Sequence, residues 1–421
     1  MKDASESSTS WRQRQLGPLR QRNFRRFFIG YSTSVIGTSM AAIGVSFAVI
    51  DNGGTATELG VVLTAGIAAT IGCLAIGGVI ADRFGRRLVM LVSDCLRFVA
   101  QAVFAALVLI GHPHIWSLVV LTAVVGAGTG LFMPALAALP EQLLSADELH
   151  DANLLTGLAN NLGTIFGPVA AGAIIAATSA GVVMAIDAAT YGVSIIALST
   201  LHIDQWNRST GTSMLRDLRE GWVAWRSRSW IWITDIKFAL SNAIVLAPLW
   251  VLGPVVSMQR LGGAKSWGIV LSSLGSGAVL TGLVLRGRRI TRPLTFITLA
   301  QVAWALPVVG VALVLPYPVI AIGAFIAGCG SAAFFGVWTT TLQRNVPAEV
   351  LARVSSYDYL ASFLLAPIGF AIVGPIASVV GTSQVLWFGA IWQIASTIVV
   401  LFLPQVRHFT DRNIDTDPGR D

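Results

Sequence analysis

The sequence predicts an all-α membrane protein in which twelve transmembrane helices form two pseudo-symmetric six-helix bundles. The 421 residues are 54% hydrophobic and 12% charged, and their mean hydropathy of +0.72 is far from that of soluble globular domains. Apolar runs of about 20 residues, long enough to cross a hydrocarbon core of about 30 Å, recur along the chain. Segments of the first half recur in the second half, which indicates a duplicated bundle.

Twelve apolar runs follow a polar, basic N-terminal segment. That segment lacks the apolar stretch and cleavage site of a signal peptide, so we expect the first run to be retained. The runs cover residues 27–50, 58–80, 88–110, 115–141, 152–177, 181–201, 231–257, 267–286, 294–315, 318–342, 355–380 and 383–403. The expected domains are an N-terminal tail (1–23), an N-terminal bundle (24–201), a linker (202–229), a C-terminal bundle (230–404) and a C-terminal tail (405–421).

Loop charges predict the orientation. The net charge of +7 comes from basic residues spread over short loops, which argues against a nucleic-acid partner. Arginines gather in the loops on the side of the N-terminal tail, whereas the opposite loops have only Arg260 and Lys265 as fixed positive charges. Because positive loops stay in the cytoplasm, we expect a multi-pass protein in the lipid bilayer of the bacterial inner membrane, with both termini cytoplasmic.

The linker contains an amphipathic pattern. Leu215, Leu218, Trp222 and Trp225 follow helical spacing, with charged residues between them. The pattern predicts a helix that lies in the membrane surface. A passive tether between the bundles and a regulatory site are both consistent with it.

The internal repeat is clearest in two segments. Residues 126–129 (Gly-Ala-Gly-Thr) align with residues 328–331 (Gly-Cys-Gly-Ser), and the match continues without gaps into the following loop. Residues 60–63 align with residues 268–271. Chance similarity between apolar helices explains an unbroken match less well than duplication does.

A dense polar turn separates the second and third runs. Gly85 permits the positive φ of a sharp reversal, and Gly78 lets another backbone come close. Asp82 can accept hydrogen bonds from the free N–H groups of a helix N-terminus, while the arginines favour an anionic membrane face. Such a turn can hold helices together and still release them. Its residues are Gly78, Asp82, Arg83, Gly85, Arg86 and Arg87.

This turn resembles the signature G-x3-D-R-x-G-R-R/K of the major facilitator superfamily, and every signature position is filled. The resemblance implies that superfamily's transporter fold, with a substrate site near mid-membrane between the halves. It also implies a conformational latch, in which Asp82 meets the N-terminus of the eleventh helix and a loop arginine meets Glu141, with Arg353 nearby. An ordinary positive-inside loop is the alternative.

The fifth run contains a second motif. Small residues at 163, 167 and 171 form a groove that admits a neighbouring helix, and Pro168 removes one backbone hydrogen bond. The run resembles the antiporter motif g-x3-G-P-x2-G-G of the superfamily's exporters, except that Ala171 replaces the first glycine of the final pair. This resemblance favours export over uptake, and ordinary helix packing is the alternative. The motif positions are Gly163, Gly167, Pro168 and Gly172.

Further segments, at residues 94–97, 139–141, 147–153 and 187–191, are similar to the drug:proton antiporter branch that includes macrolide-efflux proteins and the enterobactin exporter. The fourth run lacks the arginine of the R-x-x-x-G motif, so the proton-coupling residue is not implied by the resemblance. Carboxylates inside the spans are the candidates, because a buried charge costs about 2.5–3.5 kcal/mol on insertion scales. Asp187 is the first choice, followed by Asp358 and Asp235. A packed polar contact is the alternative for Asp187, and snorkelling or pairing for the other two.

Polar and aromatic side chains on the central helices are the candidates for the substrate cavity. Aromatic faces with a few hydrogen-bonding groups suit a small amphiphilic molecule, cationic molecules included. For each of these residues taken alone, core packing is a more common role than ligand binding. They are Asn153, Thr156, Asn160, Asn242, Trp250, Phe334, Trp338, Tyr359 and Phe363.

The sequence contains no Walker loop and no protease or hydrolase motif, so we expect neither an ATPase nor an enzyme. His112 and His114 have no further metal-ligating residues near them in the sequence, so we expect surface residues there and no metal site. We therefore expect a monomeric secondary transporter without a cofactor that exports drugs or natural products by alternating access, with the proton gradient as its energy source. A siderophore or nutrient carrier, and a transport-incompetent sensor or scaffold, are the alternatives.

Overall fold

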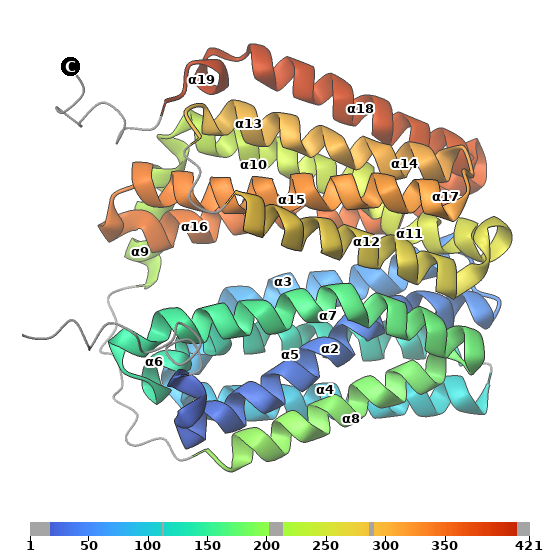
Figure 1. The fold of residues 1–421 in the computed structure, drawn as a ribbon, viewed down its shortest axis with the longest axis horizontal. Coiled ribbons are helices and arrows are strands. Elements are labelled where there is room, and N and C mark those ends of the chain that lie inside the picture. The colour runs from blue at the N-terminus through green and yellow to red at the C-terminus, as the bar shows by residue number, and fades with distance from the viewer. Residues whose placement is uncertain (1–16, 112, 202–213, 286–289, 411–421) are drawn as a thin grey trace, which may run out of the picture. The chain divides into compact units, whose positions relative to one another are not determined.

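A computed structural model describes residues 17–111, 113–201, 214–285 and 290–410, and within these residues the chain is helical (Figure 1). Twelve of its helices are long and apolar enough to span a membrane, which confirms the predicted fold class. The predicted tails beyond these limits and linker residues 202–213 lie outside the described residues. Contacts divide the chain into unit 1 (1–48 and 65–209) and unit 2 (49–64 and 210–421).

Unit 1 contains the helices of the first six spans, except for the end of the first span and the start of the second. Residues 49–64, which the sequence analysis grouped with the first bundle, belong to unit 2. The core of unit 1 includes Phe24, Phe27, Met90 and Phe132. Its helices are α2 (Arg22–Asp51), α3 (Ala56–Phe84), α4 (Arg86–Ile110), α5 (Ile115–Ala138), α7 (Leu149–Ala177) and α8 (Ala180–Ser199), with the short helices η1 (Gly17–Arg20), α6 (Pro140–Leu143) and η2 (Ala146–Glu148).

Unit 2 contains the last six spans, three of which are interrupted. The π-helical segment η3 (Asn242–Leu246) interrupts the seventh span, and a second one, η4 (Ser257–Leu261), ends it. A 3₁₀ turn η5 (Gln301–Trp304) divides the ninth span, and a turn near Leu364 divides the eleventh. Such breaks release backbone groups for other partners. The α-helices are α9 (Met214–Arg226), α10 (Ser229–Ser241), α11 (Ala247–Val256), α12 (Gly263–Val284), α13 (Pro293–Ala300), α14 (Ala305–Ala312), α15 (Tyr317–Asn345), α16 (Ala348–Phe363), α17 (Ala366–Val380), α18 (Thr382–Phe402) and α19 (Pro404–Arg407).

The sequence repeat reappears as a repeated close contact between helices. A Cβ atom added to Gly126 of α5 would lie 2.1 Å from the carbonyl oxygen of Gly66 in α3, and one added to Gly328 of α15 would lie 1.9 Å from that of Leu274 in α12. The alignment of residues 60–63 with 268–271 places Gly66 opposite Leu274. Both units therefore bring the same pair of helices together at the same aligned glycine, because small residues let backbones approach in a membrane.

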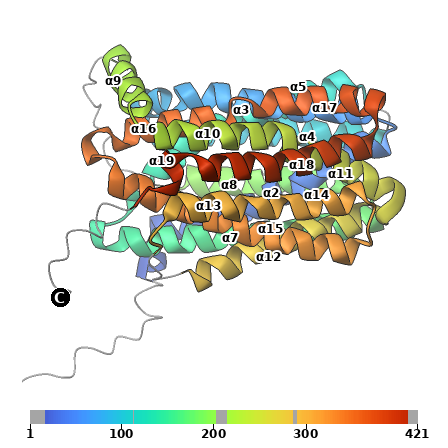
Figure 2. The same ribbon diagram turned by 90° about the horizontal axis from the view of Figure 1, so that it is seen from above.

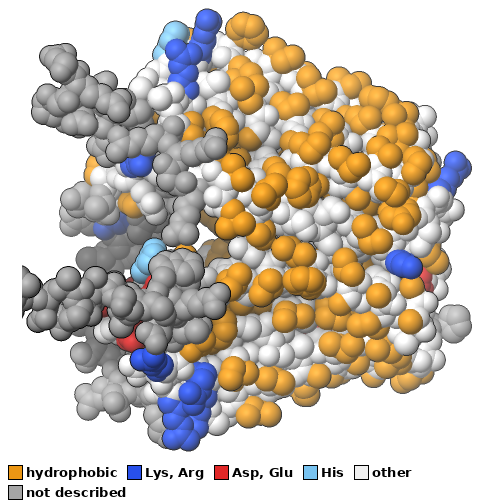
Figure 3. Space-filling view, in the orientation of Figure 1, with side chains coloured by type: hydrophobic (Ala, Val, Ile, Leu, Met, Phe, Trp, Pro, Cys, Tyr) orange, Lys and Arg blue, Asp and Glu red, His pale blue; other side chains and the backbone are white. Residues whose placement is uncertain are grey.

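The outer surface matches a chain surrounded by lipid. On the face shown in Figure 3, hydrophobic side chains cover the middle of the helices, and Lys and Arg side chains lie at the helix ends. Large exposed apolar side chains occur on helices of both units, for example Ile110, Phe166, Val379 and Phe402. In contact with water these surfaces would be costly, so they are consistent with burial in a bilayer.

Candidate functional site

The polar turn of the signature connects α3 to α4 through Gly85. Gly85 has a φ of 92°, in the region that favours glycine, so the reversal expected there is present. The close approach expected at Gly78 is wrong, because a Cβ at Gly78 would have no neighbour within 4 Å among the residues that the structure describes. The contact is one residue earlier, where a Cβ at Gly77 would lie 2.9 Å from the carbonyl oxygen of Gly130. A helix turns by about 100° per residue, so this shift moves the contact to another face.

Two arginines of the turn bind the ends of neighbouring helices within unit 1. Arg86 donates to the carbonyl oxygen of Ala138 and lies 3.4 Å from the carboxylate of Glu141. Arg87 donates to the carbonyl oxygens of Leu198 (2.8 Å) and Ser199 (2.6 Å). Guanidinium groups thus satisfy the free carbonyls at the C-terminal ends of α5 and α8. The turn therefore connects the start of α4 to the ends of α5 and α8, within unit 1.

The other latch residues have different surroundings. The side chains of Asp82 and Arg83 are exposed at the end of α3. Arg353, which the resemblance placed near the latch, forms an ion pair of 2.5 Å with Glu220 of α9. The contact of Asp82 with the eleventh helix remains a prediction.

The motif of the fifth span is a packing surface for α2. A Cβ added to Gly163 would lie 2.8 Å from the Val35 side chain, and one added to Gly167 would lie 2.6 Å from the Cβ of Ser39. Pro168, Ala171 and Gly172 are buried as well. The groove predicted from the small residues is therefore filled by the first span.

A charged cluster is buried between α4 and α8, which lie side by side in unit 1 (Figure 1). Asp94 and Asp187 have no exposed surface, and Arg97 is 4% exposed. Arg97 forms an ion pair with Asp94, and its guanidinium lies 4.3 Å from the ring centre of Phe132 and 4.6 Å from that of Tyr191. Ser194 donates to Asp94 at 2.6 Å. One arginine is thus enclosed by a carboxylate and two aromatic faces.

Asp187 belongs to this cluster. Its carboxylate accepts a hydrogen bond of 2.7 Å from Gln101, and Thr190 donates to its backbone carbonyl. The guanidinium of Arg97 also interacts electrostatically with it. A Cβ added to Gly37 of α2 would lie 2.6 Å from its carboxylate oxygen, so the first span covers the group closely. This geometry matches the packed polar contact that the sequence analysis held as the alternative for Asp187.

The other two candidate carboxylates meet each other in unit 2. Asp235 of α10 and Asp358 of α16 share a side-chain hydrogen bond. Trp225 donates to Asp235 at 2.7 Å, and Trp338 donates to Asp358 at 2.9 Å. Asp235 is buried, whereas Asp358 is partly exposed. The pair is therefore enclosed on the Asp235 side and partly open on the Asp358 side.

Lys237 does not pair with Asp235, although the two are close in sequence. It is buried, and its ammonium group donates to the side-chain oxygen of Gln301 at the 3₁₀ turn η5. Gln393 of α18 donates to the backbone carbonyl of Gln301 at 2.7 Å and accepts from Ser241 at 3.0 Å. The break in the ninth span thus provides the carbonyl that completes this network.

The candidate substrate residues fall into two groups. Phe334 and Trp338 are buried in the aromatic core of unit 2, where Phe238 stacks on Phe334 with ring centres 5.0 Å apart. Asn242 is buried and donates to the carbonyl of Ser362 at 3.1 Å. In contrast, the side chains of the other residues retain exposed surface. These are Asn153, Thr156, Asn160, Trp250, Tyr359 and Phe363.

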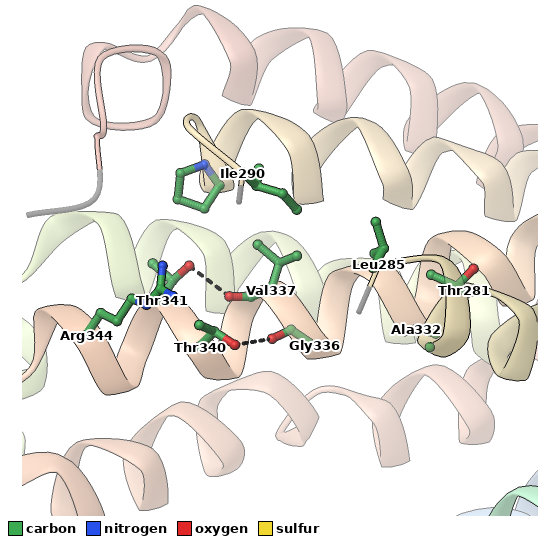
Figure 4. Close-up of a pocket in the computed structure, with 11 residues that line it drawn as sticks. Thr281, Leu285, Ile290, Ala332, Gly336, Val337, Thr340, Thr341 and Arg344 are labelled. Atoms are coloured by element: carbon green, nitrogen blue, oxygen red, sulfur yellow. Dashed lines mark hydrogen bonds between the residues drawn. The ribbon is translucent and has the colours of Figure 1, made fainter. Parts of the chain in front are cut away.

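A cavity of about 280 Å³ lies among α12, α13 and α15 in unit 2 (Figure 4). The hydroxyl groups of Thr340 and Thr341 donate to the carbonyls of Gly336 and Val337 on their own helix, as Figure 4 shows. These hydroxyls are therefore engaged by the backbone. None of the residues predicted for the substrate cavity lines it.

Sequence reasoning missed several of these partners. Gln101, Gln301 and Gln393 are buried amides inside spans, and none was singled out as a site residue. Their signal was the same as that of the carboxylates, since a polar side chain within an apolar run needs a partner. The sequence does not identify that partner.

Comparison with protein families gives a match over nearly the whole chain. The family described as transmembrane secretion effector matches residues 13–417. The chain is 24% identical over 392 residues to the multidrug efflux pump Tap of Mycolicibacterium fortuitum, covering 89% of this chain and 94% of that protein. It is 21% identical to macrolide efflux protein A of Streptococcus pyogenes, covering 87% of this chain and 91% of that protein.

Solved structures of transporters share the fold. The nucleoside transporter NupG superposes with a TM-score of 0.71 at 12% identity, covering 90% of this chain and 98% of its own. The D-xylose–proton symporter superposes with a TM-score of 0.68 at 14% identity, covering 92% and 98%. At these identities the likeness concerns the fold and not the substrate.

Proposed function

Since this chain belongs to the major facilitator superfamily of membrane transporters, we propose that it exports amphiphilic drugs or natural products across the bacterial cytoplasmic membrane in exchange for protons. The observation that supports export most strongly is the match to efflux proteins along nearly their whole length. The family description, transmembrane secretion effector, supports the same direction.

Alternating access is the proposed mechanism. The repeated contact at Gly126 and Gly328 supports two homologous bundles that move as bodies. In this proposal the bundles rock about a central substrate site, and the latch at Asp82 breaks and re-forms in each cycle. Carboxylates within the spans support proton exchange, because ionisable groups are costly and rare in a membrane and commonly mark ion or proton pathways.

Accumulation of dyes and antibiotics tests the direction of transport. In a bacterial host without its own pumps, we expect cells that contain this protein to hold several-fold less dye than cells without it, and a protonophore to abolish the difference. Higher accumulation would instead indicate an uptake carrier. Equal accumulation over a broad panel of amphiphilic compounds would contradict export.

Asp82→Asn tests the latch. We expect the variant to insert normally but its export rate to fall by about tenfold or more, because a hydrogen bond to a charged group contributes about 1.5–3 kcal/mol. Initial efflux rates, normalised to the amount of protein in the membrane, measure the effect. Asp147→Asn removes an exposed carboxylate on η2 and is the matched control. Normal export by a well-expressed Asp82→Asn protein would exclude the latch role.

Asp187→Asn tests the first coupling candidate. Because Asp187 is fully buried and bonded to Gln101, we expect the pH dependence of export to stay unchanged in this variant. The carboxamide oxygen can still accept from Gln101, so we also expect the protein to fold. Efflux measured at several pH values provides the comparison with the unmodified protein. A displaced pH profile would make Asp187 a proton-coupling residue.

A further inference from the structure

The carboxyl groups of Asp235 and Asp358 lie within hydrogen-bonding distance of each other. An ionised carboxylate can only accept, so a hydrogen bond between two carboxyl groups requires one proton. The indole N–H groups of Trp225 and Trp338 supply one further donor to each aspartate. These donors stabilise the negative charge that stays on the pair after one proton has bound.

No basic side chain neutralises this pair within the part of the chain that the structure describes. The nearest in sequence are Lys237, which donates to Gln301, and Arg353, which pairs with Glu220. Neither Asp235 nor Asp358 forms an ion pair with a described residue. The other charged residues on described parts of the elements packed against α10 and α16 are Arg219, Glu220 and Arg226 on α9, Arg344 on α15 and Arg407 on α19. A proton therefore relieves the repulsion between the two aspartates.

The linker helix α9 packs against α10 and α16, the two helices that carry the aspartates. Figure 2 shows α9 at the end of α16 and α10, steeply inclined to both. Glu220 pairs with Arg353 of α16, and a Cβ added to Gly221 would lie 2.9 Å from the ring of Tyr357. The ring centre of Trp222 lies 5.8 Å from that of Tyr357. Trp225, which the sequence analysis predicted to face the membrane surface, is instead buried in unit 2.

Trp225 makes the docking of α9 depend on the carboxyl pair. Its indole bonds to Asp235 on α10, whereas Glu220 and Gly221 contact α16. The helix α9 can therefore make all of these contacts only while α10 and α16 lie close together at this end. The bond between Asp235 and Asp358 joins these two helices at that point.

We infer that Asp235 and Asp358 form a proton-binding site that controls the docking of the linker helix α9 onto α10 and α16. With one proton bound, the pair closes and Trp225 reaches Asp235. Loss of the proton to solvent leaves two carboxylates that repel each other, so the helices separate at this end and α9 is released. As a step in export this inference rests on the proposed function, whereas the docking equilibrium exists without substrate.

Hydrogen exchange of the full-length protein in lipid nanodiscs measures the docking directly. After correction for intrinsic exchange, we expect the protection of amides in residues 214–226 to fall at least about tenfold between about pH 6 and about pH 9, as release of one proton allows. Asp358→Asn is expected to keep the protection at both pH values, because its carboxamide N–H donates to Asp235 as the shared proton does. Asp51→Asn, a carboxyl variant at the end of α2, is expected to behave like the unmodified protein.

Infrared spectroscopy supplies a second measurement, independent of helix motion. We expect a protonated-carboxyl C=O band that disappears over the same pH range and is missing in both Asp235→Asn and Asp358→Asn. The inference would be overturned if the protection of α9 in the unmodified protein did not change with pH. An equal loss of protection in both of these variants would overturn it as well. Exchange is measured without substrate, so a protein that shows this switch but exports nothing would refute only the proposed function.

Discussion

Arg97→Met is expected to destabilise the protein by about 3–5 kcal/mol, because it removes one partner of a buried ion pair. Asp94 has no exposed surface and, among the described residues, would retain only Ser194 as a side-chain hydrogen-bond donor. Asp187 would lose the same positive charge. The methionine side chain fills much of the space of the arginine stem, so the expected loss comes from charge rather than from volume.

A double-mutant cycle separates these effects. Arg97→Met combined with Asp94→Asn removes both charges of the ion pair, so we expect a large part of the stability to return. Denaturant unfolding in mixed detergent micelles measures the free energy of each variant. Arg260→Met, at an exposed arginine of η4, is the matched control and should change stability by less than about 0.5 kcal/mol. If the double variant is no more stable than Arg97→Met, the ion pair is not the cause.

Gly126→Ala and Gly328→Ala are each expected to lower stability by about 1–3 kcal/mol or more, although each adds a single methyl group. The new Cβ atoms would lie 2.1 Å and 1.9 Å from backbone oxygens of the neighbouring helix, so two helices must move apart. Backbone atoms cannot rotate away as the end of a long side chain can. Thermal unfolding midpoints and the yield of monodisperse protein in detergent measure the effect.

Two other glycines provide the matched controls. Within the described part of the chain, a Cβ added to Gly157 of α7 or Gly336 of α15 would have no neighbour within 4 Å. We expect their alanine variants to be neutral or slightly more stable, because alanine favours the helix by up to about 1 kcal/mol. Equal losses at all four positions would show that a general cost of alanine, and not helix contact, explains the result.

Local features of the candidate site were predictable from the sequence, but its contacts were not. Gly85 was expected to adopt a positive φ and does, because that property depends on one residue and its turn. The contact expected at Gly78 falls at Gly77, since contacts depend on which face of a helix meets its neighbour. Asp235 was expected to snorkel or to pair, and Lys237 was its nearest cation in sequence. Its partners prove to be Trp225 and Asp358, on two other helices.

The sequence by itself determined that the chain is a twelve-span membrane protein built from a repeated unit. Span length and apolar composition follow from the thickness of the bilayer, which acts on each helix separately, and a repeat is visible in any alignment of the halves. Only the tertiary structure decided that Arg97 lies between Asp94 and Tyr191, that Asp235 meets Asp358, and that Trp225 joins the linker helix to that pair. Lateral packing brings together residues from different spans, and the spacing of residues along one helix carries no information about its neighbours.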